Sequence, residues 1–233
     1  MNHSPILILQ TDRTRPPAAI ADVLARRGYP TIACRVRDAA DLPGPRLVES
    51  AGAVIVLDAA RDAPAAQDDT LAWLGECRAR ERPLLGIGHG GELLTHLHGG
   101  ALASCPPVRG WFALNLHPRA AATPWLTQLG PRLPCGLLWQ ERTWQPPVDA
   151  LPLLAAAPDA CVAWAAHGAL ALRVHIETTA ALYAEWLASW ASQPEVPALD
   201  WQDHASLVEA GTAVAAQRKL AEALLDGWLA TIT

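Results

Sequence analysis

Residues 83–94 decide the fold of this 233-residue chain, and they read Pro83-Leu84-Leu85-Gly86-Ile87-Gly88-His89-Gly90-Gly91-Glu92-Leu93-Leu94. The apolar run that ends at Ile87 is short and follows Pro83, which is typical of a buried strand. The residues from Gly90 to His98 have the pattern of a helix. The sequence therefore predicts a strand that turns into a helix with almost no loop between them.

The first hundred residues repeat this alternation of strand and helix. Ala53–Leu57 is apolar throughout, as expected of a strand that is covered on both faces. The other strands expected here are Ile6–Leu9 and Thr31–Val36. One helix is expected to begin at Pro16-Pro17, and another is expected over Asp68–Arg80. Four such strands alternating with helices predict an α/β fold with a parallel, doubly wound sheet.

The chain changes character at Pro106-Pro107, after which short strand-like segments are joined by Pro-rich connections. Such segments usually form the antiparallel edge of a mixed sheet. They are Trp111–Leu116, Gly136–Trp139, Cys161–Ala165 and Leu170–Val174, and a helix over Thr179–Ser192, a linker over 193–200 and a helix over Asp203–Leu229 follow them. We expect one domain over 1–192 and an appendage over 193–233 that packs on the domain or on a partner.

The composition limits the classes of function. Hydrophobic residues make up 51% of the chain and charged residues 18%, so the chain can bury a large core. The net charge of −5 provides no basic surface for nucleic acid, and no apolar run is long enough to cross a membrane. Five scattered cysteines without a CxxC pair indicate reduced thiols in a cytoplasmic protein. The abundance of Arg, Ala and Pro is typical of a GC-rich bacterial genome.

Three regions of the chain resemble class I glutamine amidotransferases. Residues 83–94 resemble the family's nucleophile elbow, P-x-L-G-I-C-x-G-x-Q-L-L, and Ala169–Glu177 resembles its A-x-G-x-Q-F-H-P-E segment. Gly110–Phe112 and Leu138–Trp144 are similar to stretches of the branch that contains the GMP synthetase glutaminase domain. The resemblance runs from about Ile6 to Trp190. It implies a flavodoxin-like α/β fold with an open, mixed, mostly parallel sheet and helices on both faces.

The resemblance also implies a catalytic arrangement. In the family, a cysteine on the elbow attacks the glutamine carboxamide, a histidine activates the thiol, and a glutamate orients the histidine. By position, the histidine is His175 and the glutamate is Glu177. Residues two apart at a strand end share a face, so this pair can meet. Because the elbow is strained, we expect Gly88 at its apex to have a positive φ.

The departures from the family pattern fall on the residues that carry its chemistry. Gly88 stands at the cysteine position, so the covalent route is lost, and Glu92 stands where a glutamine helps to hold the substrate. Asp58-Ala59 replaces the glycine pair of the oxyanion loop, where a carboxylate would oppose the developing negative charge. Gln140 replaces a histidine and Ile176 replaces a proline. We therefore expect a protein without glutaminase activity.

Several roles stay open for individual residues. The expected remains of the oxyanion and substrate pocket are Asp58, Ala59, His89, Glu92 and Gln140. His175 and Glu177 are either a remnant pair or a live acid–base pair. No cofactor and no metal are expected, although Glu92 and His96 share a helix face. Two further alternatives are Cys77 or Cys105 as a substitute nucleophile and Trp139 or Trp144 as a stacking surface.

Three hypotheses of function follow. The first is a degenerate amidotransferase-like protein that binds a small ligand, of unknown identity, or a separate synthetase or ligase subunit. The second is a hydrolase or transferase of altered chemistry, in which His175 and Glu177 activate water. The third is a scaffolding homodimer that pairs through the helix over Asp203–Leu229. An engineered Cys→Gly variant of an active glutaminase is the remaining alternative.

Overall fold

The computed structural model describes residues 3–58, 64–127, 129, 133–157, 160–191 and 207–232. The described strands are β1 (Ile6–Gln10), β2 (Thr31–Arg35), β3 (Ala53–Val56), β4 (Leu84–Ile87), β5 (Ala101–Phe112), β6 (Asn115–Leu116), β7 (Gly136–Gln145), β8 (Leu151–Ala157), β9 (Ala160–Ala166) and β10 (Ala169–Leu172). The described helices are α1 (Ala18–Arg26), α2 (Pro45–Ser50), α3 (Pro64–Ala79), α4 (His89–Leu97), α5 (Pro124–Thr127), α6 (Ala180–Ala191) and α7 (Leu207–Leu229), and the short 3₁₀ turns are η1 (Ala39–Asp41) and η2 (Pro118–Ala120).

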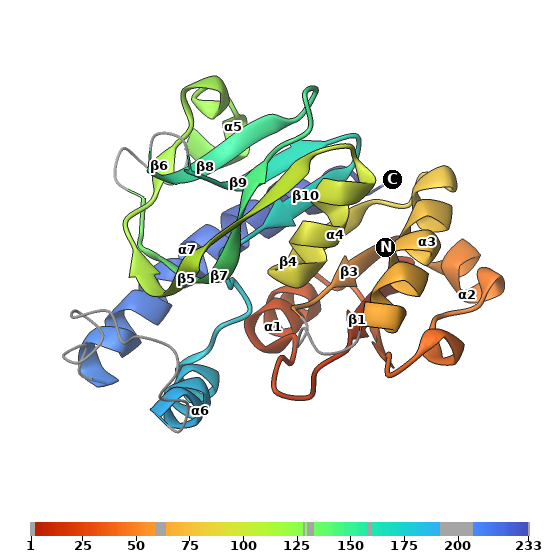
Figure 1. The fold of residues 1–233 in the computed structure, drawn as a ribbon, viewed down its shortest axis with the longest axis horizontal. Coiled ribbons are helices and arrows are strands. Elements are labelled where there is room, and N and C mark those ends of the chain that lie inside the picture. The colour runs from red at the N-terminus through yellow and green to blue at the C-terminus, as the bar shows by residue number, and fades with distance from the viewer. Residues whose placement is uncertain are drawn as a thin grey trace.

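Within these residues, eight strands form the main sheet in the order β2-β1-β3-β4-β10-β9-β8-β6 (Figure 1). The five strands from β2 to β10 are parallel to their neighbours. Strands β9, β8 and β6 extend the sheet in antiparallel fashion. This architecture confirms the predicted α/β fold with a mixed, mostly parallel sheet.

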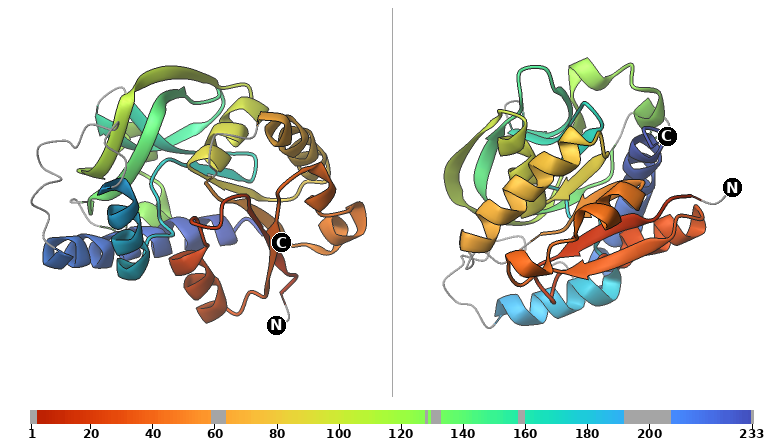
Figure 2. Two further views of the ribbon diagram at one scale, coloured as in Figure 1. Left: turned by 60° about the horizontal axis from the view of Figure 1, so that its bottom comes forward. Right: turned by 90° about the vertical axis from the view of Figure 1, so that its right-hand side faces the viewer.

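Successive residues of β1 point to opposite faces of the sheet, and both faces are buried. Ile6 and Ile8 belong to the apolar core that includes side chains of α1 and α7. Leu7 and Leu9 belong to a second core, on the side of α3 and α4. Figures 1 and 2 show the sheet between these two helical layers. A strand covered on both faces has no polar side to present, which explains the uninterrupted apolar run.

The second half of the chain departs from the sequence prediction. Pro106-Pro107 does not end a strand but lies inside β5, where the register with β7 shifts between Ser104 and Val108. Proline has no N–H for a ladder, and such an irregularity accommodates it. The expected segment Trp111–Leu116 is divided, because Trp111 and Phe112 end β5 of the separate β5–β7 ribbon, whereas Asn115 and Leu116 form β6 at the antiparallel edge of the main sheet. Gly136–Trp139 belongs to β7 of the ribbon and not to that edge.

Two other expectations about this half were wrong or incomplete. Leu170–Val174 was expected at an antiparallel edge, but β10 lies inside the sheet and runs parallel to β4. Strand β8 was not expected, because Pro152 interrupts its apolar pattern, and the register between β8 and β9 shifts at Pro152. The parallel pairing of β10 with β4 brings the segment after β10 to the same end of the sheet as the turn after β4.

The last helix packs on the core of the same chain. Its buried side chains include Leu220, Leu224, Leu225 and Trp228. The apolar side of this helix, through which a homodimer was hypothesised to form, therefore lies largely against the rest of the same chain. Arg27 at the end of α1 pairs with Asp226 of α7 at 2.8 Å. The expected linker over 193–200 and the expected helix start at Asp203 lie outside the described residues, so the domain division stays a prediction.

Among the described residues, no helix combines the length and the apolar character that a membrane span requires.

Candidate functional site

The turn between β4 and α4 forms one side of the site. Gly88 has φ 55° and ψ −117°, which confirms the expected positive φ. A Cβ atom at Gly86 would lie 2.4 Å from the carbonyl oxygen of Gly90, and one at Gly90 would lie 2.2 Å from the carbonyl oxygen of Val56. The turn is therefore packed backbone against backbone, and Gly86 and Gly90 leave no room for side chains.

The carboxylate of Asp58 occupies the space directly above Gly88. Asp58 follows β3, and its Oδ1 accepts a hydrogen bond of 2.7 Å from the backbone N–H of His89. A Cβ atom built at Gly88 would lie 2.3 Å from that same Oδ1. A side chain at position 88 would therefore not fit while Asp58 keeps its present position. The N–H of His89, the first residue of α4, is already used by an anion from the chain itself.

Arg15 holds Asp58 in this place. The Arg15 guanidinium pairs with Oδ2 of Asp58, and the two side chains are only 7% and 14% exposed. The guanidinium also lies 3.8 Å from the ring centroid of Trp139 and 5.1 Å from that of Trp186. The charge of Asp58 is thus balanced inside the protein, and the face of Trp139 is covered by a protein cation instead of a ligand.

His175 and Glu177 meet immediately after β10, as the sequence predicted. His175 Nδ1 and Glu177 Oε1 are 2.8 Å apart, and both side chains are at most 1% exposed. Burial lowers the pKa of His175, but the charge and hydrogen bond of Glu177 outweigh burial, and Asp58 adds to them, so the pKa is raised above its ordinary value. Among the described residues, His175 Nε2 has no hydrogen-bond partner.

Glu92 closes the far side of the site. Its Oε2 lies 3.4 Å from His89 Nδ1 and 3.4 Å from an Arg142 guanidinium nitrogen. Between these groups is a cavity of about 20 Å³, lined by Asp58, Gly88, His89, Glu92, Trp139, Trp144 and Arg173. A cavity of that size holds about one water molecule. The structure therefore offers little space for an amino-acid side chain next to Gly88.

Arg173 is the buried cation of this cavity. Burial lowers its pKa to about 10, against the opposing charges of Cys105 and Glu92. Its guanidinium donates to the backbone carbonyl of Arg142 and lies 5.3 Å from the ring centroid of Trp144. Arg173 precedes His175 by two residues, and its Nη1 is buried without a hydrogen-bond partner among the described residues.

The remaining predicted site residues are not brought into this cluster. Ala59 lies outside the described residues, and the side chain of Gln140 in β7 is not described. His96 is exposed, whereas Glu92 is 6% exposed, so the pair does not share a site. No group of three or more His, Cys, Asp or Glu side chains in the described segments is arranged to hold a metal.

The two cysteines considered as substitute nucleophiles differ in position. Cys77 is fully buried on α3, and burial raises its pKa to about 12. Cys105 lies near the guanidinium of Arg173 and is half-buried. Neither thiol is in the place above Gly88 that Asp58 occupies.

Sequence reasoning missed Arg15 and Gln217. Gln217 of α7 donates to the backbone carbonyl of His175 at 2.9 Å and accepts from the backbone N–H of Leu137 at 2.7 Å, so it fixes the segment that carries the pair. A polar residue in the buried stripe of α7 was a usable signal for Gln217. For Arg15, the signal was a charged loop directly after a central parallel strand, where ligands usually bind.

No protein-family model and no curated protein sequence matches this chain. Solved structures do match it. A glutamine amidotransferase from Methylobacillus flagellatus superposes with a TM-score of 0.81 at 21% identity, over 99% of this chain and 96% of that one. A glutamine amidotransferase from Thermotoga maritima has a TM-score of 0.78 at 16% identity, over 98% and 97% of the two chains.

A third match is a protein from Thermoplasma acidophilum described as a candidate subunit of GMP synthase, with a TM-score of 0.58 and 15% identity, over 82% of this chain and 98% of that one. At these identities the likeness concerns the fold. The chain thus has the fold of class I glutamine amidotransferases.

Proposed function

We propose that this chain is a non-catalytic, glutamine amidotransferase-like subunit whose former glutamine site is filled by its own Asp58–Arg15 pair. The observation that carries the proposal is the position of Asp58 Oδ1, 2.3 Å from where a Cβ at Gly88 would lie. In this proposal Gly88 marks the lost nucleophile, and Asp58, Ala59, His89, Glu92 and Gln140 are what remains of the oxyanion and substrate pocket.

The chemistry of the site supports this proposal. Acyl transfer needs a nucleophile and donors for the developing oxyanion. Glycine offers no nucleophile, and the N–H of His89 already donates to a carboxylate. Loss of one oxyanion donor typically lowers the rate by about 10²–10³. In this proposal the buried His175–Glu177 pair is a remnant, and Gln217 of α7 holds the backbone of the segment that carries it.

The biochemical role that we propose is partner binding. One similar solved structure is described as a candidate subunit of GMP synthase, that is, one part of a larger enzyme. We propose that this chain likewise binds a synthetase or ligase on a separate polypeptide, without supplying ammonia. Co-elution with a synthetase or ligase of the same organism would support this role, and the absence of any complex with such enzymes at micromolar concentrations would count against it.

The loss of catalysis is tested on the intact chain. We expect no saturable release of ammonia from glutamine and no thermal shift with glutamine. Saturable ammonia release that disappears in His175→Ala would overturn the proposal, because it would require a working site around that histidine.

A second candidate function rests on His175 Nε2, which lacks a hydrogen-bond partner among the described residues. A hydrolase that activates water through His175 and Glu177 would use this atom. The raised pKa disfavours it as a base near neutral pH. Hydrolysis of simple esters or amides that is lost in His175→Asn would favour this candidate, whereas equal rates in both proteins would exclude it.

A further inference from the structure

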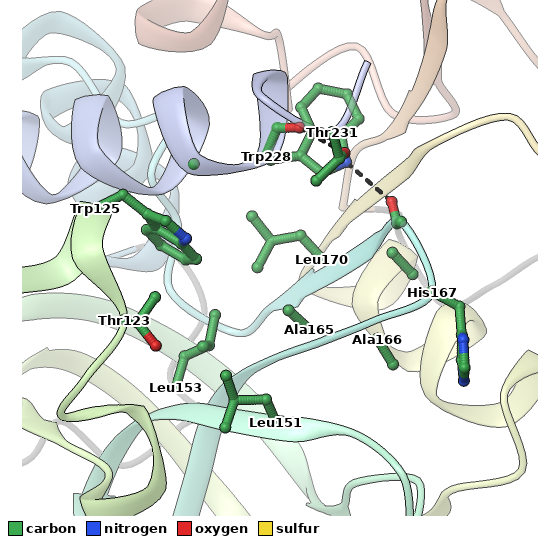
Figure 3. A pocket seen from close by; sticks show the side chains of 13 residues that line it. Thr123, Trp125, Leu151, Leu153, Ala165, Ala166, His167, Leu170, Trp228 and Thr231 are labelled. Carbon is green, nitrogen blue, oxygen red and sulfur yellow. Dashed lines mark hydrogen bonds between the residues drawn. The ribbon is translucent and has the colours of Figure 1, made fainter. Parts of the chain in front are cut away.

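A second cavity lies at the opposite end of the sheet from Gly88. It has a volume of about 240 Å³ and is bounded by β8, the β9–β10 hairpin, the region around α5 and the end of α7 (Figure 3). Gly168 of the hairpin lines it and accepts a backbone hydrogen bond from Leu84 at the start of β4. The length of β4 therefore separates this cavity from the Gly88 turn.

The walls of the cavity are aromatic and aliphatic. Trp125 and Trp228 lie on different sides of it, and Leu153 and Leu170 lie between them (Figure 3). The indole N–H of Trp228 donates to the Gly168 carbonyl at 3.3 Å, so the polar atom of this ring is already used. Trp228 therefore presents mainly its apolar ring to the cavity.

The position of Trp125 depends on a glycine. A Cβ atom at Gly227 of α7 would lie 2.2 Å from the indole of Trp125. Trp125 therefore lies directly against the backbone of α7, and this contact fixes one wall. A rigid wall of this kind favours binding, because little side-chain freedom is lost when a ligand binds.

The cavity has almost no charge. Among the described residues that line it, His167 is the one with an ionisable side chain, and its ring turns away from the cavity centre (Figure 3). It pairs instead with Asp149, outside the lining. The Thr231 hydroxyl donates to the Trp228 carbonyl at 2.7 Å. An ionic ligand would lose its hydration without gaining a counter-charge, and binding would be weak.

We propose that this cavity is a binding site for a small, uncharged, planar compound of one or two fused rings, which lies against Trp125 and Trp228. An apolar cavity of about 150 Å³ in a protein core is known to bind benzene. The volume of about 240 Å³ leaves room for a second ring. This site is independent of the proposed loss of glutaminase chemistry.

The test uses the intact chain and indole as the probe, with binding measured by isothermal titration calorimetry. We expect one indole per chain, and binding at least about tenfold weaker for the charged analogue indole-3-acetate. Trp125→Ala removes a wall and should weaken binding by about tenfold or more. Ala165→Phe fills the cavity from its half-buried lining and should abolish binding. Trp73→Ala is the matched control, because Trp73 lies on α3 and lines no part of this cavity.

Binding that is unchanged by Trp125→Ala would overturn the proposal, and so would the absence of indole binding at millimolar concentration. Equal affinity for indole and indole-3-acetate would overturn the assigned ligand class. If Ala165→Phe does not fold, as judged by circular dichroism, the Trp125→Ala variant and the comparison of the two ligands still decide whether the proposed site exists. Indole binding that is lost in Arg15→Ala but kept in Trp125→Ala would place the probe at the Gly88 site and would likewise overturn the proposal.

Discussion

The β4–α4 turn and the charged cluster above it lie in one small site, but different forces fix their residues. In the turn, Gly86 and Gly90 face backbone atoms at distances that no Cβ tolerates. In the cluster, Arg15, Asp58 and Glu92 are held by ion pairs and hydrogen bonds that other side chains could provide. A turn that is fixed by packing does not depend on the identity of the charged side chains above it.

This difference explains why the turn follows the family pattern more closely than the charged cluster does. Steric demands on the turn do not depend on any substrate, so they remain when a substrate is no longer bound. The residues of the cluster are held by one another's charges and hydrogen bonds. Three changes test this contrast, from the largest expected effect to the smallest.

Loss of Arg15 should have the largest effect on stability. Arg15→Ala leaves the Asp58 carboxylate buried without its cation, and breaking such a pair typically costs about 3–5 kcal/mol of the free energy of unfolding. Urea denaturation measures it. The control is Arg27→Ala at the half-exposed pair with Asp226, where about 0.2–1 kcal/mol is expected. Equal losses in the two variants would mean that Asp58 is not held by Arg15 as described.

An added methyl group in the turn should have the next largest effect. Gly90→Ala forces a Cβ into the carbonyl oxygen of Val56, and overpacking of this kind typically costs about 1–3 kcal/mol. Gly211→Ala in α7 is the control, since a Cβ there has no neighbour within 4 Å, and it should be neutral or slightly stabilising. If both variants are as stable as the parent, the turn is not packed backbone against backbone.

The dependence of stability on pH should show the smallest effect. The pKa of His175 is raised on folding, so its contribution to stability is complete below the unfolded value of about 6.5 and is lost as pH rises through the folded value. The free energy of unfolding should therefore fall above about pH 6.5, by at most about 1.4 kcal/mol per pH unit for one proton. This part of the decline should be missing in His175→Asn. A parallel pH profile for both proteins would contradict the raised pKa.

The sequence predicted the turn better than its surroundings. The glycines at 86, 88 and 90, the apolar runs of β1, β3 and β4, and the contact between His175 and Glu177 follow from local patterns. Asp58 was expected near the oxyanion position through the resemblance. Its partner Arg15 was not, because the ion pair joins two loops that come together only after the parallel strands have assembled.

The second half was harder to predict for a physical reason. Pairing in β5, β7 and β8 depends on register shifts that place prolines where no ladder N–H is needed. A local pattern does not show where such a shift occurs, so Pro106-Pro107 looked like a strand end. Gln217 was overlooked for a similar reason, since its two hydrogen bonds reach residues on other elements.

The rate of ammonia release from glutamine by the Gly88→Cys variant tests the central claim most directly. The new Cβ would meet Asp58, and Glu92 places a carboxylate where the family pattern has a neutral amide. A comparison variant also carries Asp58→Gly, Ala59→Gly and Glu92→Gln, so that the thiol and the pocket are tested separately. We predict that Gly88→Cys alone shows no steady-state turnover, even if its thiol is alkylated. Turnover by the single variant at about 1 s⁻¹ or faster would contradict the account, because it would mean that the oxyanion site and the substrate pocket are intact.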